Sequence, residues 1–246
     1  MGSKQMGPGT LCEPRPETAE AWRVPVLRSR ISDHGPSLAR VPDDAIDNGP
    51  AARRVEVALA ARRGEIGAVR AALADKDARV RAAALSALAR LAELSEDEVA
   101  AAINDVDPIV RRRICELSTT APHGAFETLL FDADASVVES AAFACGEQAI
   151  AASIDALVSV ATDHHNALCR ESAVAALGVL GIASGLEAIL AATTDVAAVR
   201  RRAVIALSNF EGDQATTALQ RALQDRDWQV RQAAEDVLDI NRTSTR

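Results

Sequence analysis

The stretch Asp75-Lys76-Asp77-Ala78-Arg79-Val80-Arg81, which runs into Ala84-Leu85, decides the fold of this 246-residue chain. The same pattern recurs five more times: an acidic or polar turn, an anchor residue, usually an arginine, and then small apolar residues. The anchors are separated by 30, 27, 32, 30 and 31 residues, and they are Val80, Val110, Val137, Cys169, Val199 and Val230. Copies at this spacing indicate a repeat protein in which each copy holds two short helices and two turns.

The acidic turn divides each copy into a first and a second helix. First helices are predicted to end just before the turn, as in Ile66–Leu73, Leu186–Leu190 and Thr216–Leu223. An aspartate there suits the start of the second helix, because its carboxylate accepts from free amide groups and complements the helix dipole. The arginine after the anchor is expected near the acidic turn of a neighbouring copy. The result would be a ladder of Asp–Arg pairs, each contributing a few tenths of a kcal/mol if exposed.

Small residues recur four places after the anchor, where they let neighbouring helices approach closely. The alanines at this position are Ala84, Ala141, Ala173, Ala203 and Ala234. Together with the other apolar positions they form one broad arc of the second helix, which a single copy cannot bury alone. We therefore predict an all-α fold, an α-solenoid of about six helix pairs over residues 65–240, with a capping helix at about 51–63.

Units of the form Asp-x-Asp-x-x-Val-Arg-x-x-Ala-x-x-Ala-Leu resemble HEAT repeats. The likeness is strongest in the run Ala175-Ala176-Leu177-Gly178-Val179-Leu180-Gly181, followed by Leu186-Glu187-Ala188-Ile189. It is a resemblance to the short HEAT-like variety of about 30 residues first noted in phycobilisome lyases. The resemblance implies an armadillo-like α-solenoid. Bacterial members of the family are mostly scaffolds, adaptors or lyase accessory subunits, so it also implies a protein partner.

Residues 1–50 differ in character from the rest of the chain. They hold seven of the nine prolines, which exclude a long helix, and we predict a disordered arm there, with the solenoid occupying 51–246. One apolar cluster interrupts the arm, formed by Trp22, Val24, Val26, Leu27 and Ile31 among three arginines. It either docks into a groove of this protein or a partner, or belongs to a tail without a docking role.

Charge and apolar patterning exclude several classes of partner. Lys and Arg number 27 against 35 Asp and Glu, a net charge of −8, and this disfavours nucleic-acid binding. Only the runs Arg111–Arg113 and Arg200–Arg202 argue for it. No apolar run is long enough to span a membrane and no secretory signal begins the chain, so a cytoplasmic location is expected.

Nothing in the sequence points to a cofactor, a metal or a catalytic residue. The alternative function is a HEAT-like enzyme or accessory subunit, similar to deoxyhypusine hydroxylases or chromophore lyases. The hydroxylase resemblance would imply His-Glu pairs as iron ligands, yet no histidine here is followed by glutamate. The doublet His164-His165 is expected in a solvated turn. Cys115, Cys145 and Cys169 are expected to be inert packing residues.

A binding surface is the remaining candidate site. Positions two, six and nine after each anchor lie opposite the apolar arc, on second helices that line the concave side in such solenoids. Trp228, in the last acidic turn, either contacts the partner or caps the core. We predict a non-enzymatic scaffold or adaptor whose oligomeric state stays open; the alternative is a face that contacts only solvent. The predicted partner-binding residues are Arg112, Glu116, Glu139, Phe143, Glu171, Arg201, Ile205, Asp236 and Trp228.

Overall fold

The computed structural model describes residues 49–244, with side chains described as far as Asp239. The arm predicted at 1–50, including its apolar cluster, lies outside these residues except for its last two. Within the described part every regular element is a helix. The α-helices are α1 Pro50–Arg63, α2 Ile66–Ala71, α3 Ala78–Arg90, α4 Glu96–Ile103, α5 Pro108–Glu116, α6 Ala135–Glu147, α7 Ile154–Asp163, α8 Ala167–Leu180, α9 Leu186–Ala192, α10 Ala197–Ala206, α11 Asp213–Ala222 and α12 Trp228–Ser244. The 3-10 helices are η2 Ala72–Ala74, η3 Phe126–Phe131, η4 Ala151–Ser153, η5 Ala183–Gly185 and η6 Leu207–Asn209.

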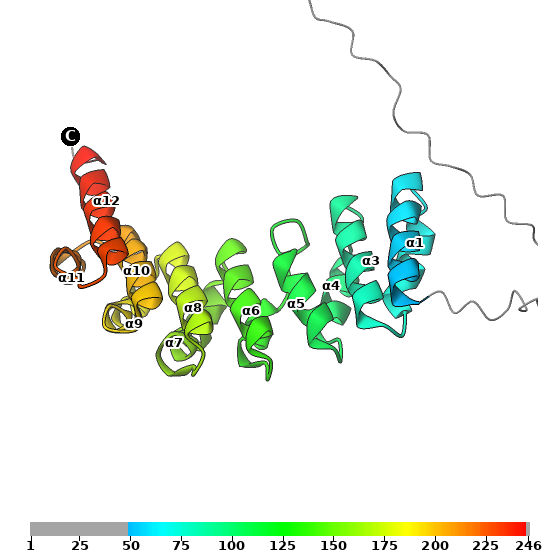
Figure 1. Cartoon of the computed structure of the whole chain (residues 1–246), viewed down its shortest axis with the longest axis horizontal. Coiled ribbons are helices and arrows are strands. Elements are labelled where there is room, and N and C mark those ends of the chain that lie inside the picture. Colours follow the sequence, from blue (N-terminus) through cyan, green and yellow to red (C-terminus); the bar gives the residue numbers. More distant parts are fainter. Residues whose placement is uncertain (1–48, 245–246) are drawn as a thin grey trace, which may run out of the picture. The chain divides into compact units, whose positions relative to one another are not determined.

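The α-solenoid predicted from the repeat spacing is confirmed. Six helix pairs follow α1, and in the third pair the first helix is the 3-10 helix η3. The second helices α3, α5, α6, α8, α10 and α12 lie side by side in chain order, and α1 stands at the start of the same row (Figure 1). We call these seven helices the second-helix row. The first helices α4, α7, α9 and α11 lie along one side of it.

Small residues at the predicted position allow the row to close. The residues four after each anchor are fully buried, including Ile114, the one copy without alanine. Nine after the anchor, the approach is closer still. A Cβ added at Gly146 would lie 3.2 Å from the Cα of Ala176, and one at Gly178 would lie 2.6 Å from the Cβ of Ala206. These two glycines were expected on the solvent face. Instead they lie against Ala176 and Ala206 of the next second helix, where an added Cβ would have no room.

In four of the six turns two aspartates play different roles. The second aspartate caps the second helix, as Asp77 does by accepting from the backbone N–H of Arg79 at 2.9 Å. The first aspartate accepts from the backbone N–H of the second, as Asp75 does from Asp77 at 2.8 Å. Its carboxylate can still accept hydrogen bonds from the preceding copy. The Asp-x-Asp motif therefore supplies two groups: the second aspartate caps its own helix, and the first accepts hydrogen bonds from the preceding copy.

The arginine after the anchor binds that acceptor, and this confirms the predicted ladder. Two of its guanidinium nitrogens donate to the first aspartate of the next copy over 2.6–3.0 Å, and a third donates to a carbonyl of its own turn, as in Arg81 to Asp75. Four such pairs are Arg81–Asp105, Arg111–Asp132, Arg170–Asp195 and Arg200–Asp225, and Arg53 of α1, which follows no anchor, binds Asp75 in the same two-pronged way. Their side chains are mostly buried, so the pairs are stronger than the exposed ones considered from the sequence.

The ladder has one missing rung, between the third and fourth copies. Val138 stands where the arginine would be and is buried, while His164 stands where the first aspartate would be. The Nδ1 atom of His164 accepts from the backbone N–H of Asn166 at 3.1 Å, which reproduces the local turn. Both members of the pair are replaced together, so the exchange leaves neither charge buried without a partner.

Candidate functional site

The exposed side of the second-helix row carries most of the residues predicted to bind a partner. Helices α6, α8 and α10 enclose a groove of about 490 Å³ there, which we call the central groove. Three predicted residues line it together: Glu139 and Phe143 from α6, and Glu171 from α8. Gly146 and Ala176, the residues of one close helix–helix contact, also line it.

Apolar side chains are unusually exposed in the central groove. Phe143, Leu168 and Val179 are 49%, 54% and 62% exposed, and all three line the same hollow. Carboxylates surround them, from Glu139, Glu147 and Glu171, and the single cation is Arg202. Arg202 pairs with Glu171 at 3.3 Å and so joins α8 to α10. An apolar centre with a charged rim is the arrangement that protein interfaces use.

The sequence reasoning missed Leu168, Val179, Glu147 and Arg202. They occupy positions one before, three after and ten after the anchor. At about 100° per residue these positions fall near 260°, 300° and 280° around the helix. They lie outside the apolar arc and next to positions two, six and nine, which were predicted to face a partner. The helical period therefore indicates that these four residues are also on the exposed face. Only the contact between neighbouring helices decides which of these residues meet in one hollow.

The other predicted residues lie outside the central groove. Arg112 is in α5, where its guanidinium forms an ion pair with Glu116 at 3.1 Å, and Arg113 forms another with the same carboxylate at 2.7 Å. Arg201 is half-buried and Ile205 is exposed, both on α10. Asp236, on α12, accepts from the side chain of Gln232 at 2.9 Å. Trp228, the first residue of α12, is 65% exposed and does not cap the core.

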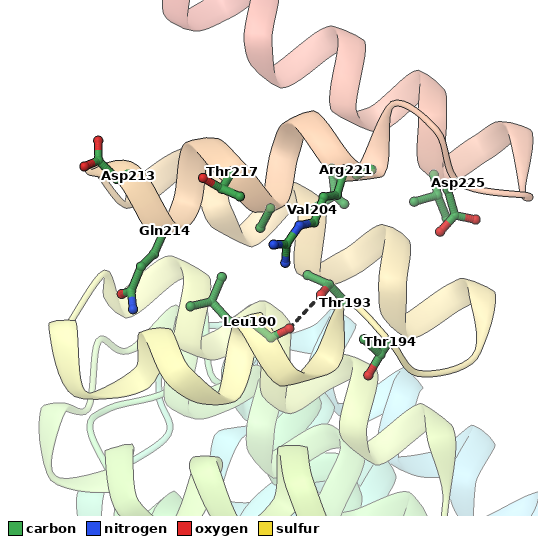
Figure 2. Close-up of a pocket in the computed structure, with 12 residues that line it drawn as sticks. Leu190, Thr193, Thr194, Val204, Asp213, Gln214, Thr217, Arg221 and Asp225 are labelled. Carbon is green, nitrogen blue, oxygen red and sulfur yellow. Dashed lines mark hydrogen bonds between the residues drawn. The ribbon is translucent and has the colours of Figure 1, made fainter.

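Another pocket, of about 520 Å³, opens between the first helices α9 and α11 (Figure 2). Asp213, Gln214, Thr217 and Arg221 line it from α11. The hydroxyl of Thr193, which faces them, donates to the carbonyl of Leu190 at 2.6 Å and so is already bound at the end of α9. The lining holds no thiol or histidine, and its polar groups are those of ordinary helix surfaces.

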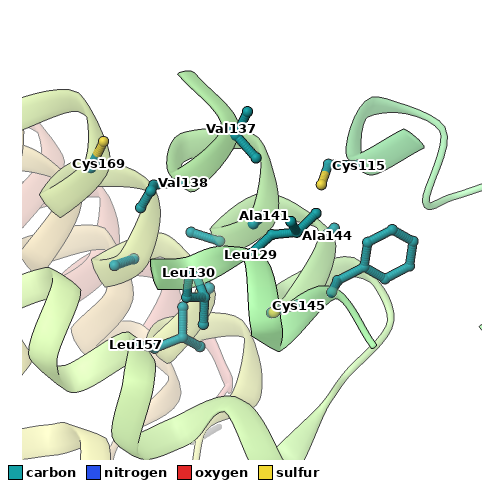
Figure 3. Packing of buried hydrophobic residues seen from close by; sticks show 14 of the residues in the cluster. Cys115, Leu129, Leu130, Val137, Val138, Ala141, Ala144, Cys145, Leu157 and Cys169 are labelled. Atoms are coloured by element: carbon teal, nitrogen blue, oxygen red, sulfur yellow. The ribbon is translucent and has the colours of Figure 1, made fainter. Parts of the chain in front are cut away.

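Groups suited to catalysis are buried or isolated in the described part of the chain. Cys115, Cys145 and Cys169 lie among apolar side chains in the core (Figure 3). Burial raises the pKa of the Cys115 and Cys145 thiols to about 12, so they are neutral and poorly nucleophilic at neutral pH. The rings of His164 and His165 stack at 4.6 Å in the turn before α8. No cluster of three or more His, Cys, Asp or Glu suited to a metal occurs among residues 49–239.

Comparison with known families places repeats at both ends of the solenoid. A model of HEAT repeats matches residues 170–239, and a model of the single HEAT repeat matches residues 66–95. No curated protein matches the chain. In the described residues no helix is long and apolar enough to cross a membrane.

Two solved structures of engineered proteins agree with the chain in fold. One crystal structure of an engineered protein shares 18% identity with the chain, covers 71% of it and 95% of its own length, and has a TM-score of 0.54. A second engineered protein shares 20%, with coverages of 71% and 97% and a TM-score of 0.56. A designed armadillo repeat protein, solved in complex with a (KR)4 peptide, shares 18%, with coverages of 76% and 85% and a TM-score of 0.43.

Proposed function

Because this chain is a HEAT-repeat protein, we propose that it is a scaffold that binds a segment of another protein along the exposed face of its second-helix row. The sequence predicts that this face is concave, and the central groove lies on the same face. The observation that carries the proposal is that groove. Residues from consecutive second helices, about one repeat apart in the sequence, meet there around exposed Phe143, Leu168 and Val179.

The chemistry of the central groove favours a protein segment over a small ligand. Its apolar side chains are about half exposed, so they gain most when a partner side chain removes them from water. The glutamates at the rim favour a partner with basic residues beside its apolar ones. Such a segment would insert one or two apolar side chains between Phe143 and Val179 and place its cations on Glu139 and Glu171.

We also propose that the scaffold acts in the cytoplasm. The described cysteines are free thiols rather than disulfides, and a reducing compartment keeps thiols in that state. Cell fractionation followed by immunoblotting with an antibody to the full chain tests the location.

The groove is tested by affinity capture from lysate with the full-length chain, followed by quantitative mass spectrometry. The groove variant combines Phe143→Ala, Leu168→Ala and Val179→Ala. The matched control combines Val106→Ala, Phe131→Ala and Val196→Ala, which truncate exposed apolar residues of similar size away from the groove. We expect the captured amount of each specific partner to fall about tenfold or more with the groove variant and to be unchanged with the control.

Two results would contradict the proposal. If the groove variant retains every specific partner, the binding surface is elsewhere. If both variants lose the same proteins equally, capture reflects general apolar adhesion. Circular dichroism of each variant shows whether the helices remain, because all six positions are exposed and truncation there leaves the core unchanged.

A further inference from the structure

The start of the second-helix row holds a second groove with the opposite charge. Helices α1, α3 and α5 enclose about 650 Å³, which we call the terminal groove. Its charged lining residues are all arginines: Arg54, Arg79, Arg90, Arg112 and Arg113. Alanines such as Ala58, Ala83 and Ala87 line it between them. In a protein with a net charge of −8, five guanidinium groups around one hollow lined by no carboxylate are a marked local excess.

Most of this positive charge is not neutralised within the described chain. Glu116 forms ion pairs with both Arg112 and Arg113, so one carboxylate is shared by two cations. Among residues 49–239, Arg54, Arg79 and Arg90 have no carboxylate partner; Arg90 only donates to the carbonyl of Ser86 at 3.3 Å. In the ladder, by contrast, every guanidinium binds an aspartate. The terminal groove therefore keeps free the groups that elsewhere in this protein bind carboxylates in pairs of hydrogen bonds.

An apolar surface continues from the arginines along α1 and α3. A neighbouring hollow of about 600 Å³ shares Ala58, Ala87 and Arg90 with the terminal groove and adds Arg62. It also exposes Val55, Leu59 and Leu91, by 58%, 45% and 37%. Arginines beside exposed aliphatic side chains match a ligand that carries both carboxylates and apolar groups.

We infer that the terminal groove binds an acidic, amphipathic segment of the protein partner; this inference rests on the proposed function and names the chemistry of its second contact. The carboxylates of the segment pair with Arg54, Arg79 and Arg90, and its apolar side chains cover Leu59 and Leu91. The geometry favours a peptide over a nucleic acid. No aromatic residue lines the groove to stack a base, and a longer polyanion would continue onto α6 and meet the glutamates of the central groove.

The two grooves together define the polarity of the partner on the row. An acidic segment lies over α1–α5 and a basic, apolar segment over α6–α10. Reversing the partner would place like charges opposite each other at both grooves, which is costly. The row therefore selects the direction of the bound chain as well as its composition.

Fluorescence anisotropy with the full-length chain tests the terminal groove. The probe is a fluorescein-labelled peptide of alternating glutamate and leucine, and the competitor is an oligodeoxythymidine of the same total charge. The test variant combines Arg79→Glu and Arg90→Glu. The control combines Arg221→Glu and Arg226→Glu, which make the same charge change at exposed arginines of the last helix pair.

We expect the peptide to bind the wild-type chain, to bind the test variant about tenfold or more weakly, and to bind the control within about twofold. Absence of binding to the wild-type chain, or equal loss in both variants, would overturn the inference. Tighter binding of the oligonucleotide would overturn it in favour of nucleic acid. The central-groove variant separates the two proposals: it should bind this peptide normally, so loss of lysate partners and loss of the peptide are independent results.

Discussion

At the scale of the residue, the arginine after each anchor connects two copies through one side chain. Arg200 donates two hydrogen bonds to Asp225 of the next copy and one to the carbonyl of Asp195 in its own turn. Its side chain is 6% exposed and that of Asp225 is 14% exposed, so both charges are largely removed from water. The pair is favourable only while both partners are present.

Removing one partner of this pair should be costly. Arg200→Met keeps the aliphatic volume but leaves the Asp225 carboxylate without its cation, and we expect the free energy of unfolding to fall by about 2–4 kcal/mol. The control is Arg63→Met, in the exposed pair Arg63–Glu65, which should change the free energy of unfolding far less, because water screens that pair. Urea unfolding followed by circular dichroism measures both. Equal losses in the two variants would show that burial does not strengthen the ladder.

At the scale of the element, consecutive second helices pack as closely as their smallest residues permit. Gly178 in α8 faces Ala206 in α10, where an added Cβ would lie 2.9 Å from the backbone Cα as well as 2.6 Å from the Cβ. Backbone cannot rotate away as a side chain can. The spacing of α8 and α10, and with it the shape of the central groove beside them, depends on the missing side chain.

Gly178→Ala tests this close approach, because two effects oppose each other. Alanine favours the helix by up to about 1 kcal/mol, but the clash with Ala206 should cost about 1–3 kcal/mol and prevail. We expect a net loss in the free energy of unfolding, measured by thermal and urea denaturation. Gly67→Ala is the control, because its added Cβ meets nothing within 4 Å in α2 and only the helix preference remains. A stabilised Gly178→Ala variant would contradict the assigned contact.

At the scale of the whole molecule, the arrangement of charge matters more than its sum. Five aspartates of the ladder have pKa values below their usual range. For Asp75, Asp195 and Asp225 the main cause of the lowered pKa is the hydrogen bond from an arginine of the preceding helix of the row. For Asp105 and Asp132 burial opposes the shift, but the arginine and a backbone N–H together outweigh it.

The lowered pKa values predict the pH dependence of stability. Below the usual aspartate pKa of 3.8 the unfolded chain binds protons before the folded chain does. The ladder's contribution is therefore fully present well above that value, and it is lost as the pH falls toward the folded-state pKa values. We expect urea midpoints to be constant from about pH 6 to pH 5 and to fall steeply below about pH 4. The decline should be smaller in Arg200→Met, and a midpoint that rises on acidification would contradict the ladder.

The sequence by itself determined the repeat, the six helix pairs, the small residues between helices and the pairing of arginine with aspartate. These features recur every 27–32 residues, so each copy indicates the same contact with the next copy. A pattern repeated six times does not arise by chance. The sequence also contains the exception to the Asp–Arg pattern, because Val138 and His164 replace an arginine and an aspartate that would otherwise pair. Glycine at position nine was the exception, because helical angle alone placed it in solvent.

Only the tertiary structure decided which surface residues act together. Leu168 and Val179 join Phe143, and Arg54 joins Arg79 and Arg112, because adjacent helices of the row bring together side chains that are about one repeat apart in the sequence. A groove between two helices depends on their distance and rotation, which Gly146 and Gly178 set through backbone contact. Periodicity predicts the faces of single helices; the hollow shared by two neighbours is fixed by how closely those helices pack.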